Sequence, residues 1–217
     1  MHVPYTVIST GSQGNAVIVN EAVLIDCGVS FKAIKPYVKK LKLVLLTHIH
    51  GDHFNPTTLK LLHQERPCVR FGCGRWLVTP LLAAGVSPSK IDVLSDNIIY
   101  GYGICNVIPV PLVHDVPNFG FKIHFPIGKV FYATDTNNLN GISAIHYDLY
   151  LVEANYTDEE IQKRIAEKKE TGEYPYEKRV LQYHLSKKKC DDFIYRNCSP
   201  TSEYAYMHCH QDKYTPS

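Results

Sequence analysis

A short histidine-rich segment constrains this chain more than any other feature. The run Leu43–Leu46 is wholly apolar, which is typical of a strand covered on both faces. Four potential metal ligands follow it in a span of six residues: His48, His50, Asp52 and His53. Alternate side chains of an extended segment share a face, so His48 and His50 can bind one ion. A turn at Gly51 would direct the other two side chains toward a neighbouring ion.

The rest of the chain alternates short strands with helices. Turn residues separate the expected strands 5–8, 16–19 and 22–26, and strands also dominate residues 91–133, 147–153 and 204–208. Helices are expected after Ser30, from Asn55-Pro56 to Glu65, over 76–84, over 157–169 and after Ser186. A strand-rich half that repeats, with helices to cover two sheets, predicts an α/β fold, a four-layered αββα sandwich. We expect one domain over residues 1–217.

Composition narrows the class of protein. The chain has 217 residues, 45% hydrophobic and 20% charged, which is the balance of a globular domain able to bury its own core. A net charge of +2 is too small to argue for a nucleic-acid protein by electrostatics. Neither a membrane-spanning run nor a secretory signal is evident. The seven cysteines have no regular spacing, so we expect free thiols and a cytoplasmic location.

The segment Thr47-His48-Ile49-His50-Gly51-Asp52-His53 resembles the T-H-x-H-x-D-H motif of the metallo-β-lactamase superfamily. Three further residues stand after apolar runs in the order of that family: His114, Asp135 and His208. The resemblance implies that His48, His50 and His114 bind one ion. It implies that Asp52, His53 and His208 bind the second, with Asp135 bridging both. His210, two residues after His208, is a rival for the last ligand.

The same resemblance implies the cofactors and the type of reaction. A nitrogen and oxygen ligand set suits two Zn²⁺ ions, with Mn²⁺ as the alternative, and a hydroxide shared by the ions would be the nucleophile. Iron-using redox relatives carry Glu in place of His50, and true β-lactamases lack a bridging Asp135. We therefore expect a hydrolase that does not act on antibiotics.

Further segments resemble a phosphodiesterase branch of the superfamily, which includes bacterial exonucleases and the phage and bacterial anti-Pycsar cyclic-nucleotide phosphodiesterases. They are the segments 9–15, 24–28, 152–156, 178–180 and 183–186. The resemblance makes His184 the general acid that protonates the leaving alkoxide, beside Asp52 as the second catalytic residue; otherwise His184 caps or packs against a helix. Asp26 and Glu153 either orient the site histidines or are structural.

The substrate is the open question at this stage. Lys and Arg concentrate only over residues 163–189, where Glu dilutes them, so no basic track is evident for a polymer. We expect a 3′,5′-cyclic nucleotide, with Tyr156, Tyr174 or Tyr176 available to stack on the base. The resemblance implies a homodimer, with the excursion 157–182 and its tip at Gly172 and Pro175 closing the partner's pocket. A phage-encoded form would then act in the host cytoplasm against cyclic-nucleotide immunity.

Three alternatives remain. The first is a nuclease on single-stranded DNA or RNA, which the same motifs permit. The second is a lactonase or thioesterase, although those enzymes lack an equivalent of His184. The third is a binding module without activity, against which the intact ligand set argues.

Overall fold

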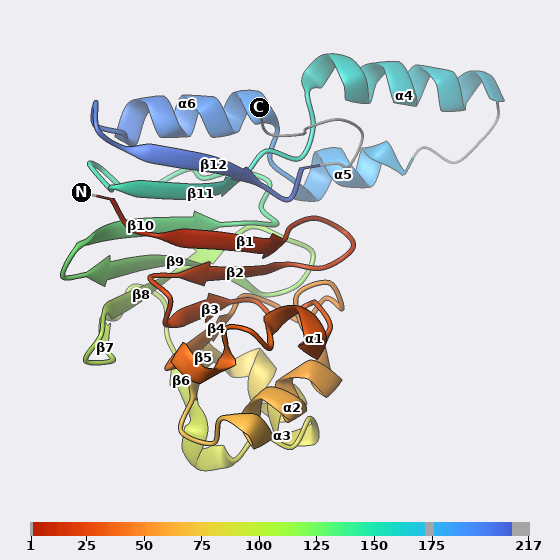
Figure 1. The fold of residues 1–217 in the computed structure, drawn as a ribbon. Helices are drawn as coiled ribbons and strands as arrows, with labels where there is room; N and C mark the ends of the chain where they lie inside the picture. Colours follow the sequence, from red (N-terminus) through yellow and green to blue (C-terminus); the bar gives the residue numbers. More distant parts are fainter. Residues whose placement is uncertain (1, 172–175, 210–217) are drawn as a thin grey trace.

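A computed structural model describes residues 2–171 and 176–209. Its strands form two six-stranded sheets (Figure 1). The first sheet has the order β1-β2-β3-β4-β5-β6 and consists of Tyr5–Ser9, Ala16–Val19, Val23–Ile25, Leu43–Leu46, Arg70–Gly74 and Ile91–Leu94. The second has the order β12-β11-β10-β9-β8-β7 and consists, from β7 to β12, of Tyr100–Gly101, Asn106–Leu112, Asn118–Phe125, Gly128–Ala133, Leu149–Glu153 and Glu203–Met207.

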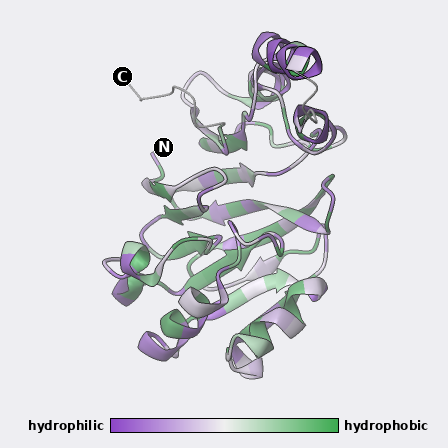
Figure 2. Cartoon of the chain, turned by 90° about the vertical axis from the view of Figure 1, so that its right-hand side faces the viewer, coloured by the Kyte–Doolittle hydropathy of each residue, from purple (hydrophilic) through white to green (hydrophobic). Residues whose placement is uncertain are grey.

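Four of the six α-helices among the described residues cover the outer faces of the two sheets. The helices are α1 (Phe31–Ile34), α2 (Pro56–Glu65), α3 (Val78–Ala83), α4 (Asp158–Thr171), α5 (Glu177–Tyr183) and α6 (Lys187–Asn197), with short 3₁₀ turns at Val38–Lys40, Arg75–Leu77 and Pro88–Lys90. In Figure 1, α1, α2 and α3 lie beyond the first sheet, and α6 lies beyond the second. Figure 2 shows apolar strands in the middle and strongly polar turns of helix at the outside.

Strand β4 shows why the layers stack in this order. Leu43 and Leu45 point between the two sheets, whereas Val44 and Leu46 point toward α1, α2 and α3. All four side chains are buried. A third apolar cluster, which includes Tyr150 and Phe193, fills the space between the second sheet and α6. The expected four-layered αββα sandwich is thus confirmed, and the continuous apolar run is explained by burial on both faces.

Local sequence signals set several element ends. Helix α2 spans the residues expected, because the Asn55 side chain accepts a hydrogen bond from the Thr58 amide and proline occupies the first turn. Ser186 caps α6 in the same way through the Lys189 amide. Ser30 precedes α1 but makes no such bond, and that helix ends after four residues.

Two elements differ from the sequence expectation. Helix α5 was not expected, because charged residues around it favoured a continuous excursion; the structure packs its Val180 against Ile161 of α4 and against Tyr156. Within the strand-rich range 91–133, a strand was expected over residues 98–100, but β7 is only Tyr100–Gly101. The excursion's tip, Gly172 and Pro175, lies outside the described residues, as do Tyr174 and His210. Within the described ranges, no helix is both long and apolar enough to cross a bilayer.

Candidate metal centre

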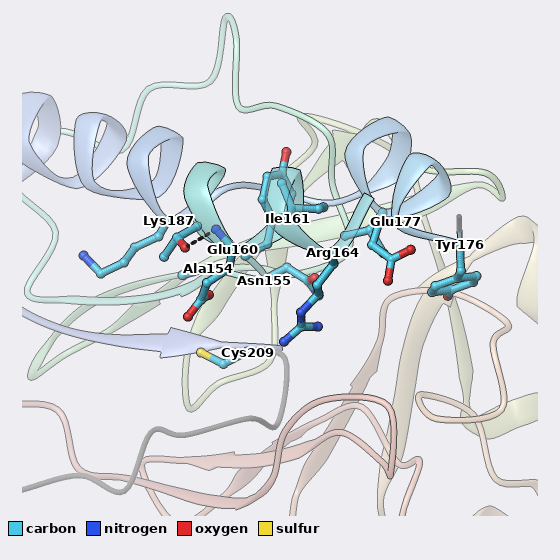
Figure 3. Close-up of a pocket in the computed structure, with 12 residues that line it drawn as sticks. Ala154, Asn155, Glu160, Ile161, Arg164, Tyr176, Glu177, Lys187 and Cys209 are labelled. Atoms are coloured by element: carbon cyan, nitrogen blue, oxygen red, sulfur yellow. Dashed lines mark hydrogen bonds between the residues drawn. The ribbon is translucent and has the colours of Figure 1, made fainter. Parts of the chain in front are cut away.

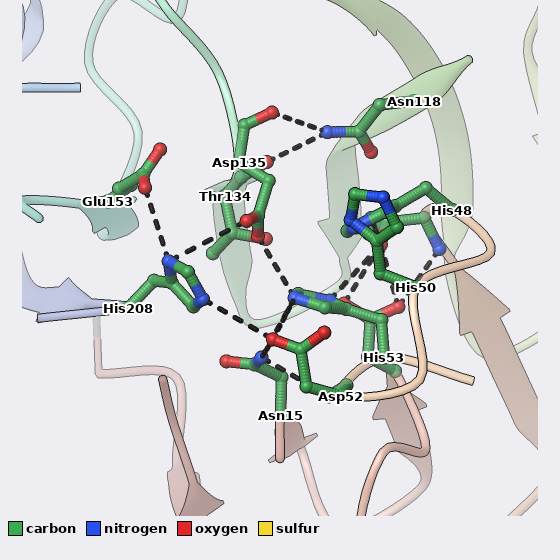
Figure 4. Close-up of polar contacts among 12 residues, drawn as sticks. Asn15, His48, His50, Asp52, His53, Asn118, Thr134, Asp135, Glu153 and His208 are labelled. Atoms are coloured by element: carbon green, nitrogen blue, oxygen red, sulfur yellow. Dashed lines mark hydrogen bonds and ion pairs between the residues drawn. The ribbon is translucent and has the colours of Figure 1, made fainter. Parts of the chain in front are cut away.

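The seven residues expected as metal ligands come from four separate segments and meet at one end of the two sheets. The loop after β4 carries His48, His50, Asp52 and His53. His114 follows β8, Asp135 follows β10 and His208 follows β12. Figure 4 shows the side chains of the loop facing those of Asp135 and His208 across a small space.

The ligand atoms are close enough to share ions. Each of four overlapping sets has its ligand atoms within 4.8 Å of one another: His48, His50 and His114; Asp52, His53 and His208; His48, His53 and Asp135; and Asp135, Glu153, His184 and His208. The first two sets match the ligands expected for the two ions. Asp135 occurs in the other two and lies 3.0 Å from His53 through Oδ2, which places it between the two groups.

The chemistry of these residues fits a metal centre. His48 is fully buried, and its Nε2 has no hydrogen-bond partner among the described residues. Nε2 of His208 is likewise buried without a hydrogen bond. Such atoms cost free energy unless something coordinates them. Burial also lowers the pKa of His48, helped by the neighbouring charge of His53, which keeps the imidazole neutral as a metal ligand must be.

The electrostatic field of the site favours cations. Burial would raise the pKa of Asp135, but the charges of His208 and His53 outweigh it and hold the pKa well below its usual range. Burial would lower the pKa of His53, yet the carboxylates of Asp135 and Asp26 raise it to about 10. The negative charge that keeps Asp135 ionised and strengthens proton binding at His53 would equally favour a divalent ion such as Zn²⁺, which would displace that proton.

Three residues of the site adopt left-handed backbone conformations. The φ angles of Asp26, Asp135 and His208 are +59°, +56° and +49°. Positive φ is uncommon for residues other than glycine, although aspartate and histidine adopt it more often than most. Residues held in such conformations cluster at functional sites, where the surrounding structure maintains them.

Asp26 contacts the site through two neighbours. Its Oδ2 lies 2.7 Å from His53 Nδ1, and because a carboxylate only accepts, that nitrogen donates, so Nε2 is the ring nitrogen that would bind a metal. Asp26 Oδ1 also accepts from the Thr47 amide at 2.9 Å. Asp26 therefore lies where it can orient the His53 ring.

Glu153 joins His184 to the ligand His208. The carboxylate is fully buried, and its Oε1 lies 2.6 Å from His184 Nδ1 and 3.3 Å from His208 Nδ1. Its Oε2 accepts from the amides of Thr136 and Leu185. Burial would lower the pKa of His184, but the hydrogen bond and charge of Glu153 raise it above its usual value. Nε2 of His184 has no hydrogen-bond partner among the described residues.

Sequence reasoning assigned no site role to several residues in contact with the centre. Asn15 Nδ2 lies 2.8 Å from His53 Nε2, and Asn155 Nδ2 donates to the His208 carbonyl at 3.0 Å. Asn118 donates to the carbonyl of Asp135 at 2.7 Å. Asp115 lies 3.1 Å from His114 through Oδ1. Only Asn15 and Asn155 had a signal, since both stand in segments that resemble family motifs.

The centre opens into a pocket whose outer wall is α5. Ser12, Asp115, Tyr176, Arg179, Tyr183 and His184 complete its lining. On the other side of α5, between α4 and the end of β11, lies a second hollow (Figure 3). Its lining includes Tyr156, Ile161, Val180 and Cys209, and it shares Tyr176 with the metal pocket. His63 lies apart from both, and its Nε2 accepts from the Ser87 amide.

The chain is similar in structure to several solved proteins. The metallo-beta-lactamase fold protein YhfI from Bacillus subtilis has a TM-score of 0.74 and 15% identity, over 97% of this chain and 87% of that one. The short form of human tRNase Z has a TM-score of 0.66 and 15% identity, over 95% and 93% of the two chains. A diphosphatase of the PhnP family has a TM-score of 0.68 and 15% identity, over 96% and 87%.

No curated protein matches the sequence. At the identities of the solved structures, similarity shows the fold and does not carry activity across. A family model, described as the beta-lactamase superfamily domain, matches residues 21–184. That range is more than half of the chain and includes all the expected ligands except His208. The protein therefore belongs to the beta-lactamase superfamily and has the metallo-β-lactamase fold.

Proposed function

We propose that this protein is a dinuclear metal-dependent phosphodiesterase that opens 3′,5′-cyclic nucleotides to nucleoside monophosphates. The observation that carries the proposal is the pair of Glu153 and His184, 2.6 Å apart at the edge of the ligand cluster. A buried carboxylate on Nδ1 stabilises the imidazolium and directs Nε2 toward the pocket. A protonated histidine beside a phosphate is what a poor alkoxide leaving group requires.

Each residue of the site would have a separate role in this reaction. His48, His50 and His114 would hold one ion, and Asp52, His53 and His208 the other, with Asp135 between them. Bound divalent ions would supply Lewis acidity and a water of lowered pKa. His184 would give its Nε2 proton to the departing 3′-oxygen, while Glu153 keeps the charged ring in place. Asp52 Oδ2, which lies 3.5 Å from His208 Nε2, would bind the second ion and orient the attacking water.

The pocket lining supports a small substrate. One guanidinium, that of Arg179, lines it, and Tyr176 and Tyr183 offer rings at its wall. The Tyr176 side chain is exposed at the rim, where a nucleobase can stack on it. Helix α4, by contrast, carries acidic residues in its first turn and lysines in its last, which is a poor track for a polyphosphate chain.

A nuclease on single-stranded DNA or RNA is the second candidate. Two of the similar structures are described as human tRNase Z and a yeast RNase Z, both at 15% identity or less. A third is described as a diphosphatase. All three names concern phosphate esters or anhydrides, which favours phosphate chemistry for this centre over lactone or thioester hydrolysis.

One assay separates the candidates. The protein, loaded with Zn²⁺ or Mn²⁺, is incubated with a panel of 3′,5′-cyclic mononucleotides and with short labelled single-stranded DNA and RNA, each with an EDTA control. We expect chelator-sensitive ring opening and intact polymers. Cleavage of the polymers with untouched cyclic nucleotides would move the protein to the nuclease class.

Two variants test the assigned residues. His184→Ala should retain both ions and lose most of the turnover; full turnover would remove the general-acid assignment. Asp135→Ala should fail to retain two ions, as measured by elemental analysis. The homodimer and the role in blocking cyclic-nucleotide immunity stay proposals, and light scattering of the purified protein tests the first.

A further inference from the structure

Asp115 is the residue of the pocket whose position needs an explanation. It directly follows His114, and its side chain is 14% exposed. Its Oδ1 is buried, has no hydrogen-bond partner among the described residues, and lies 3.1 Å from His114 Nε2 and 3.4 Å from His50 Nε2. A buried carboxylate oxygen beside two metal-ligand imidazoles has either a structural or a positioning role.

The orientation of His50 distinguishes a structural role of Asp115 from a positioning role. Its Nδ1 lies 3.4 Å from His114 Nε2, on the side where the ligand nitrogens converge. Its other ring nitrogen, Nε2, lies 3.4 Å from Asp115 Oδ1. An imidazole that binds a metal through one nitrogen commonly donates its other N–H to a carboxylate or carbonyl, which fixes the ring and its tautomer.

The other four ligand histidines already have such a partner. His48 Nδ1 lies 2.9 Å from Thr47 Oγ1, and His114 Nδ1 lies 3.2 Å from the Tyr183 carbonyl. His53 is held by Asp26 and His208 by Glu153, as described above. Among the described residues, Asp115 is the side chain placed to do the same for His50.

Asp115 is in turn tied to α5. Its Oδ2 accepts from Arg179 Nη2 at 2.5 Å, and Arg179 is in the middle of that helix. The helix is also attached through the Tyr183 carbonyl, which contacts His114, and through the Gln182 carbonyl, which accepts from Asn137 at 2.7 Å. His184 is the next residue after the helix. Through α5, the segment that carries His184 is therefore connected to the residues that would bind the first ion.

We propose that Asp115 is a positioning residue that orients His50, and that its ion pair with Arg179 links metal binding at His48, His50 and His114 to the placement of α5. The inference rests on the metal centre of the proposed function but not on its substrate. An ordinary surface ion pair would contribute little to stability and would leave the metal affinity unchanged.

The test compares Asp115→Asn and Arg179→Gln with the wild type and with Asp96→Asn, an exposed aspartate that does not line the pocket. Zn²⁺ affinities are measured by competition with a chromophoric chelator. Amide hydrogen exchange over residues 178–185 is measured with and without Zn²⁺. Circular dichroism shows that each variant is folded.

Asp115→Asn should weaken one of the two Zn²⁺ affinities by about ten- to a hundredfold, the usual effect of removing a partner of a metal ligand. Arg179→Gln should abolish the protection that Zn²⁺ confers on residues 178–185. Asp96→Asn should change neither. Unchanged Zn²⁺ affinities in Asp115→Asn, or full protection in Arg179→Gln, would overturn the proposal.

Neither readout requires a substrate, so failure of the two proposals can be told apart. A wild-type protein that binds two ions but leaves cyclic nucleotides intact refutes the proposed substrate and not this linkage. If Arg179→Gln raises KM alone, with affinity and exchange as in the wild type, Arg179 contacts the substrate instead and the linkage is refuted.

Discussion

Replacing Glu153 by glutamine tests how the protein keeps His184 charged. The change preserves the shape of a fully buried side chain and removes its negative charge. Oε1 now accepts from His184 at 2.6 Å and from His208 at 3.3 Å, and Oε2 from two backbone amides. If the amide oxygen of glutamine serves the backbone donors, its NH₂ faces both imidazoles and cannot accept from either.

The magnitude follows from the lost hydrogen bond. A hydrogen bond to a charged group contributes about 1.5–3 kcal/mol, which corresponds to about a ten- to hundredfold change in the ratio of imidazolium to imidazole. Because Glu153 raises the pKa of His184, its loss lowers that pKa. The high-pH limb of the rate profile should therefore move to lower pH, and turnover near neutral pH should fall by a similar factor.

The assay uses two substrates that differ in their need for an acid. A 3′,5′-cyclic nucleotide expels an alkoxide, whereas bis(p-nitrophenyl) phosphate expels a phenolate that leaves without a proton. Glu153→Gln should impair the first far more than the second, with metal content matched by elemental analysis. Glu65→Gln, at an exposed position of α2, is the control. Equal losses on both substrates, with two ions bound, would refute the reasoning.

Three other outcomes follow from the fold. Gly28→Ala would place a Cβ 1.7 Å from the Asp52 carbonyl, so the ligand loop must move; we expect a cost of about 1–3 kcal/mol and weakened metal binding, measured by denaturant unfolding and chelator competition. Ser186→Ala should lower the unfolding free energy by about 1 kcal/mol because the bond to Lys189 is lost, whereas Ser30→Ala should cost nearly nothing; equal shifts in Tm would contradict this. Removing the metal with EDTA should lower Tm by roughly 8–16 °C if Zn²⁺ is present at about a thousand times its Kd, and an unchanged Tm would exclude a metal bound in the folded state.

The local sequence determined those elements whose signals lie within a single short segment. The ligand loop follows β4 directly, with its four ligands in a span of six residues, and the bounds of α2 follow from Asn55 and Pro56. The order of apolar runs and isolated ligands indicated the fold and the seven metal-binding candidates, all of which the structure brings together. These signals are readable because each depends on neighbours only a few residues away.

The tertiary structure alone decided which partner each ligand has. Strands β11 and β12 pair in a register that sets Glu153 opposite Met207, and the residue after Met207 is His208. The contact between Arg179 and Asp115 joins residues 64 positions apart, and α5, which carries Arg179, had no periodic signal of its own. Register and helix docking depend on packing of the whole core, so no short segment encodes them; the sequence determined which groups could bind metal, and the fold determined which groups hold them in place.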